Sequence, residues 1–63
     1  MNKLAMIQHA RKMTGLYPDL KNEINDLVYL AIDEIEEGGS ETHETSLAIE
    51  SINQLVTDGK NNE

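Results

Sequence analysis

The sequence predicts an all-α fold, in which an antiparallel helical hairpin carries a shorter N-terminal helix. Apolar residues recur at the helical period in two long segments, and glycine and proline divide the chain into three parts. No window alternates apolar and polar residues as a half-buried strand would. Because the chain has only 63 residues, it holds at most one domain. We expect a single helical domain over residues 1–59 and a disordered tail over residues 60–63.

The first helix is predicted over residues 2–14. Asn2 is a good N-cap, because its side-chain oxygen can accept a hydrogen bond from a free N–H group of the first turn. Arg11 and Lys12 suit the negative end of the helix dipole. Gly15 is placed to end the helix in the left-handed conformation. The apolar face consists of Met6, Ile7, Ala10 and Met13.

The second helix, predicted over residues 18–37, has more apolar surface than one neighbour could cover. We expect it to begin at Pro18, since proline suits the first helical position. Its apolar stripe consists of Leu20, Ile24, Leu27, Val28, Ala31 and Ile35. Leu30 and Ile32 widen this stripe to an arc of roughly 200°, whereas packing against one neighbour needs only about 100°. This helix should therefore have neighbours on two sides.

The third helix is predicted over residues 41–58. Gly38 and Gly39 should end the second helix, Ser40 can cap the third, and Gly59 should end it. At most three connecting residues force the second and third helices into an antiparallel hairpin. The apolar stripe of the third helix consists of Ala48, Ile49, Ile52, Leu55 and Val56.

The excess of apolar surface predicts self-association. Ordering a chain costs about 1.5 kcal/mol per residue, which a core of this size only narrowly offsets, and without cysteine no disulfide can help. Two copies would pair through Leu30, Ile32 and Leu47 in a two-fold dimer, which forms a larger bundle. The alternative is a closed three-helix monomer, with Leu30 under the first helix and Ile32 beside the third.

Charge is distributed unevenly along the chain. Residues 1–12 are basic, whereas residues 13–63 carry two lysines against all twelve acidic residues, for a net charge of −7 over the whole chain. This balance disfavours binding to a phosphate backbone, which requires clustered lysine and arginine. Two interpretations stay open: the acidic surface keeps the protein soluble, or it meets a partner protein with a basic surface.

Titratable side chains gather where the second and third helices meet. They are Glu36, Glu37, Glu41, His43 and Glu44. Such a group could bind a divalent ion, but no glutamate stands three residues before a histidine, as a di-metal carboxylate bundle would require. We expect no cofactor, and the sequence leaves open whether this cluster binds a metal. No serine has a base spaced to activate it, so we expect no catalytic residue and no enzyme activity.

Tyr29 lies on the polar side of the second helix, beside Leu30. It is either simply exposed or an anchor at a protein interface, where tyrosine is over-represented. Together with the apolar edges, it completes a set of four candidate interface residues. These are Tyr29, Leu30, Ile32 and Leu47.

The sequence also predicts a soluble, cytoplasmic protein. The longest uninterrupted apolar run is Leu27–Ile32, far short of the roughly 20 residues that cross a bilayer. The N-terminal residues lack the continuous apolar core of a signal peptide.

Three functional hypotheses follow. The first is a small, acidic, non-enzymatic interaction or regulatory module that acts through a helical surface. The second is an acidic nucleic-acid mimic, and here the chain resembles the host-takeover inhibitors of bacteriophages in size and charge alone. The third is a DNA-binding regulator, although the third helix offers Asn53 and Gln54 but no lysine or arginine for reading bases.

Overall fold

The computed structural model describes the backbone of residues 2–61 and the side chains of residues 2–59. Its elements are α1 (Lys3–Leu16), a 3₁₀ turn η1 (Pro18–Leu20), α2 (Lys21–Glu36) and α3 (Glu41–Asn61). The predicted all-α class is confirmed, since the described part of the chain contains three α-helices and no strand.

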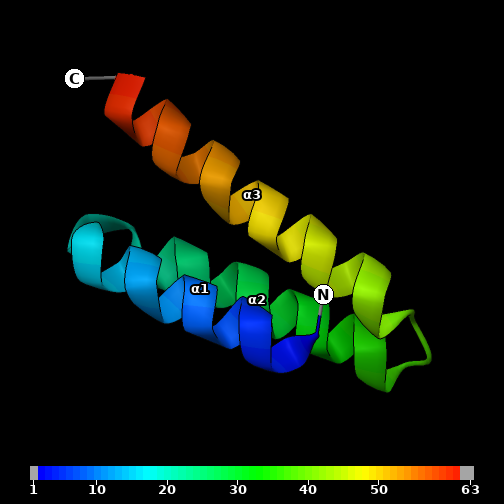
Figure 1. The fold of residues 1–63 in the computed structure, drawn as a ribbon. Coiled ribbons are helices and arrows are strands. Elements are labelled where there is room, and N and C mark those ends of the chain that lie inside the picture. The colour runs from blue at the N-terminus through cyan, green and yellow to red at the C-terminus, as the bar shows by residue number, and fades with distance from the viewer. Residues whose placement is uncertain (1, 62–63) are drawn as a thin grey trace.

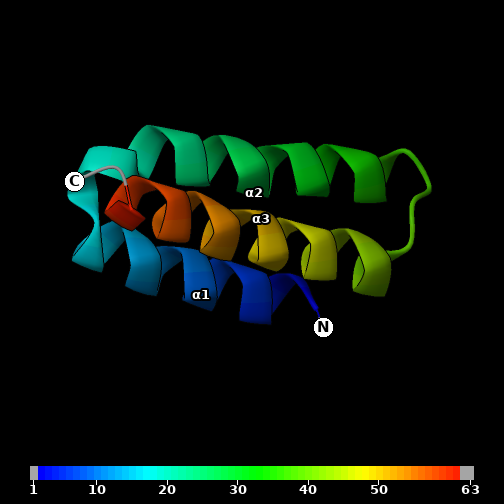
Figure 2. The same ribbon diagram turned by 90° about the horizontal axis from the view of Figure 1, so that it is seen from above.

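The three helices pack into one elongated bundle. Figure 1 shows α1 and α3 running in one direction and α2 running in the other. Seen from above in Figure 2, α3 lies over the seam between α1 and α2. Every pair of these helices is in contact, and the molecule measures 39 × 17 × 17 Å.

The start of α1 is as predicted, but its end is not. Asn2 caps the helix through its Oδ1 atom, which accepts a hydrogen bond from the Ala5 N–H at 2.8 Å. The helix continues through Gly15 to Leu16, and Gly15 does not adopt a positive φ. Pro18 explains the actual end, because a residue before proline avoids the helical region. Tyr17 accordingly has φ −130° and ψ 70°.

The beginning of α2 also differs from the prediction. Pro18 starts a 3₁₀ turn rather than the α-helix, and α2 begins only at Lys21. Such tighter turns are common at helix ends. At the other end Gly38 adopts φ +106°, which glycine tolerates, and the Gly39 N–H donates to the Glu34 carbonyl at 2.8 Å. The predicted stop at the glycine pair is confirmed.

The start of α3 is as predicted, with the Ser40 Oγ accepting a hydrogen bond from the His43 N–H at 3.3 Å. Its end is later than predicted, because the helix passes through Gly59 and includes residues 60 and 61. Gly59 lies against Leu20 and has no positive φ, so its backbone continues as an ordinary helix. Residues 62–63 of the predicted tail lie outside the described residues.

Every helix contributes to one apolar core. The buried apolar residues are Met6, Ala10, Ile24, Val28, Ala31, Ala48 and Ile52. Thr45 is buried among them, and its hydroxyl donates to the Glu41 carbonyl at 2.7 Å. Within residues 2–61, no helix combines the length and the apolar character that crossing a membrane would require.

Candidate functional site

Three of the four candidate interface residues are well exposed. The exposed fraction is 63% for Tyr29, 61% for Leu30 and 43% for Leu47, whereas Ile32 is half-buried. A large apolar side chain that stays exposed next to other apolar surface marks a possible contact site.

Leu30 and Leu47 lie together in the groove between α2 and α3. Two adjoining hollows form this groove, and they share Leu27 and Leu30. Its apolar floor consists of Leu27, Leu30, Ala31, Leu47, Ala48 and Leu55. No described residue of α1 lines it, so it lies on the side of the α2–α3 pair that faces away from α1. We call it the α2–α3 groove.

The polar rim of the α2–α3 groove is acidic. Glu23, Asp26 and Glu34 of α2 and Glu44 of α3 line it, together with the neutral Ser51. No lysine or arginine stands among the described residues that line it. The groove therefore combines exposed leucine with charge of a single sign.

Tyr29 and Ile32 lie elsewhere, in the groove between α1 and α2. There they meet Ile7 and Thr14 of α1, and the one charged side chain among the described lining residues is that of Arg11. We call this the α1–α2 groove. The four candidate residues thus divide between two faces of the molecule.

This division overturns the side assignments that the closed three-helix arrangement predicted. That arrangement placed Leu30 under the first helix and Ile32 beside the third. Leu30 instead lies with α3 residues, and Ile32 lies with α1 residues. Two residues that are 200° apart on a helix must face opposite ways, but the handedness of the bundle decides which neighbour each one meets.

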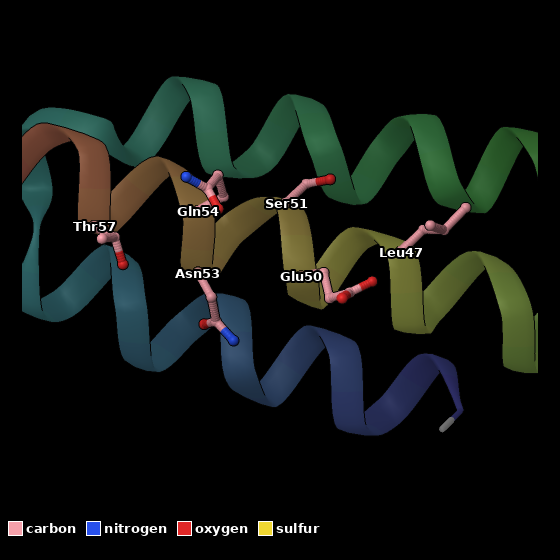
Figure 3. Close-up of a pocket in the computed structure, with 6 residues that line it drawn as sticks. All are labelled: Leu47, Glu50, Ser51, Asn53, Gln54 and Thr57. Carbon is pink, nitrogen blue, oxygen red and sulfur yellow. The ribbon is translucent and has the colours of Figure 1, made fainter.

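The outward face of α3 is shown in Figure 3. All six residues drawn there come from α3, so they line the convex side of one helix rather than a cleft between elements. Leu47 and Ser51 point toward α2, and Asn53 points toward α1. The Oδ1 atom of Asn53 lies 2.8 Å from the Nε2 atom of His9, a contact between α1 and α3 that helical periodicity alone does not predict.

The titratable cluster near the α2–α3 connection is not gathered into one site. The Glu41 Oε2 atom accepts a hydrogen bond from the Lys3 backbone N–H at 3.1 Å, and Glu44 belongs to the rim of the α2–α3 groove. Within the part of the chain that the structure describes, no three such side chains lie close enough together to hold a metal ion.

Comparison with protein-family models, with curated proteins and with solved structures finds no match for this chain.

Proposed function

We propose that this protein is a small, non-enzymatic interaction module that binds another protein through the α2–α3 groove. In this proposal α2 and α3 form the binding hairpin, α1 braces it from the opposite side, and the module acts in the cytoplasm. The observation that carries the proposal is the pair Leu30 and Leu47, exposed side by side on two different helices. Covering such side chains contributes about 1–2 kcal/mol each to binding.

A DNA-binding role is less well supported. Phosphate groups would be repelled by the acidic rim, and α3 between residues 41 and 59 contains no lysine or arginine. The polar side chains that could read bases already have partners, because Asn53 contacts His9 and the Gln54 Nε2 donates to Asp58 at 3.0 Å.

The nucleic-acid mimic is the second candidate, favoured by the net charge of −7 and by carboxylates at intervals along α2. A mimic of the phage-inhibitor type would bind a DNA-binding protein through these carboxylates alone. The two proposals differ in what they need from leucine. An interaction module needs the floor of the α2–α3 groove, whereas a mimic does not.

The homodimer stays a prediction. Leu30 and Leu47 could still meet a second copy, but Ile32 lies in the other groove and would not join them. A two-fold contact across the α2–α3 groove would also bring four carboxylates against the same four of the partner. Light scattering at micromolar concentration tests this, since a dimer gives twice the monomer mass.

Affinity capture with matched variants tests the proposed function. The full chain, the double variant Leu30→Ser/Leu47→Ser and the control Leu4→Ser are each immobilised and exposed to native lysate. Leu4 is as exposed as Leu30, at 63% against 61%, but it lines neither groove. We expect a protein that the wild type and the control capture and the double variant does not.

Two results would argue against this function. If the double variant captures the same proteins as the wild type, the α2–α3 groove is not the binding site. If capture survives the loss of leucine but fails when Glu34 and Glu44 become glutamine, the protein behaves as a mimic that binds through charge alone.

A further inference from the structure

We infer that the occupant of the α2–α3 groove is a basic amphipathic helix of a partner protein. This inference rests on the proposed function of the groove and names the chemistry of the partner. It stands on three features of the groove: its length, the sign of the charge on its rim, and its poor fit to a second copy of the chain.

The length of the groove suits one short helix. Along α2 it extends from Glu23 to Glu34, a rise of about 16 Å, which equals about three helical turns. Its floor is made by side chains of two neighbouring helices, as in grooves that receive an amphipathic helix. Such an occupant would place apolar residues at i, i+3 or i+4, and i+7 against Leu27, Leu30 and Leu47.

The rim determines the charge of the occupant. The carboxylates of Glu23 and Asp26 stand at one end of the groove, and those of Glu34 and Glu44 stand at the other. A helix in the groove would therefore meet negative charge at both of its ends. Lysine or arginine beside its apolar stripe would be complementary, and acidic residues there would be repelled.

A second copy of the chain fits this groove less well. In a two-fold contact the acidic rims would face each other. The basic residues of the N-terminal part lie on α1, whose apolar face is already buried in the core through Met6 and Ala10. A head-to-tail contact would produce a ring or an open-ended polymer rather than a two-fold dimer.

A synthetic helical peptide of about three turns serves as the probe. It has leucine at positions i, i+3, i+4 and i+7 and lysine at all other positions, and a matched control peptide has glutamate in place of lysine. Each peptide is titrated into the isotope-labelled full chain, and the amide signals are followed by NMR. We expect the lysine peptide to shift the signals of Leu30, Leu47 and Ser51, and the glutamate peptide to shift none of them.

Variants separate the contributions of leucine and charge. Leu30→Ser should remove the shifts, whereas Leu4→Ser should leave them unchanged. Glu34→Gln/Glu44→Gln should raise the Kd of the lysine peptide about threefold to tenfold, because electrostatic complementarity is lost. The control Asp33→Asn/Glu36→Gln, with exposed acids outside the α2–α3 groove, should change the Kd by less than about twofold.

Three outcomes would overturn the inference. The glutamate peptide could bind as tightly as the lysine peptide, or the lysine peptide could shift signals on every face. Sedimentation could also show a dimer that Leu30→Ser/Leu47→Ser dissociates, which would mean that a second copy fills the groove. The proposed function fails separately. If Leu30→Ser/Leu47→Ser abolishes capture from lysate while the lysine peptide does not bind, the groove is a binding site and only its partner chemistry is wrong.

Discussion

The α2–α3 groove and the α1–α2 groove share the same central helix but differ in how their apolar residues are covered. In the α1–α2 groove, Ile32 is half-buried beside Ile7 of α1, and only Tyr29 remains prominent. In the α2–α3 groove, Leu30 and Leu47 both remain exposed. In the α1–α2 groove most apolar side chains are covered by the neighbouring helix. In the α2–α3 groove large apolar side chains remain exposed to solvent.

The two grooves also differ in the charge of the residues that line them. Arg11 is the one charged side chain among the described residues that line the α1–α2 groove, whereas four carboxylates line the α2–α3 groove. Exposed apolar area alone is common on protein surfaces and carries little information. The combination of two exposed leucines with four carboxylates separates the α2–α3 groove from the α1–α2 groove, and it is the reason for proposing the α2–α3 groove as the binding surface.

The largest expected effect is a loss of stability caused by a cavity in the core. Ile52 is fully buried in α3, within the core that all three helices share. Ile52→Ala should lower the free energy of unfolding by about 2–5 kcal/mol, because it leaves a cavity in a small core. Urea unfolding followed by circular dichroism measures this loss. A variant as stable as the wild type would mean that the core does not hold the helices as described.

A change at the connection between α2 and α3 should affect one groove more than the other. A Cβ atom at Gly39 would lie only 2.8 Å from the Glu34 carbonyl oxygen, so Gly39→Ala must displace backbone. We expect a loss of about 1–3 kcal/mol in stability. NMR shifts should be larger around Leu30 and Leu47 than around Ile32.

Gly15→Ala is the matched control for Gly39→Ala. Gly15 lies within α1, and a Cβ atom there would have no neighbour within 4 Å. Alanine has a higher helix propensity than glycine, so Gly15→Ala should raise the free energy of unfolding by about 0.5–1 kcal/mol. If both variants lose stability equally, the crowding at the α2–α3 connection is not the cause.

These glycines show how far local sequence rules reach. The caps at Asn2 and Ser40 and the stop at Gly38 were predictable, because each depends on a few adjacent residues. Gly15 and Gly59 were predicted to end helices and do not. Glycine permits a left-handed residue but does not require one, so it ends a helix only where the following chain must turn.

The candidate site was predictable in part, for a similar reason. Helical periodicity places Leu30 and Ile32 on opposite sides of α2, which is what the structure has. Which helix covers each of them depends on the handedness of the bundle, and no local pattern encodes that choice. The contact of Thr45 with the core was also missed, because its hydroxyl bonds within its own helix and so tolerates burial.

The two grooves can be compared directly through neighbouring residues of α2. Tyr29 and Leu30 are exposed to nearly the same extent, at 63% and 61%, but face different grooves. Leu30→Ala should weaken binding of the lysine peptide about tenfold, whereas Tyr29→Ala should weaken it less than about twofold. Each should change stability by no more than about 0.5 kcal/mol. Equal losses of affinity, measured by calorimetry, would mean that the binding surface spans both faces.

The smallest expected effect concerns the link between α1 and α3. Asn53→Ala removes the exposed contact between the Asn53 Oδ1 atom and the His9 Nε2 atom, which lie 2.8 Å apart. The free energy of unfolding should fall by less than about 1 kcal/mol. Gln54→Ala is the control, because among the described residues the Gln54 side chain bonds to Asp58 of its own helix and not to α1. In the Asn53 variant, the rate of amide exchange should increase more in α1 than in α2 relative to the wild type. The affinity for the lysine peptide should not change. If the variant shows both faster amide exchange in α1 and weaker binding of the lysine peptide, the proposed binding site in the α2–α3 groove depends on the packing of α1. The two grooves would then act as one cooperative surface.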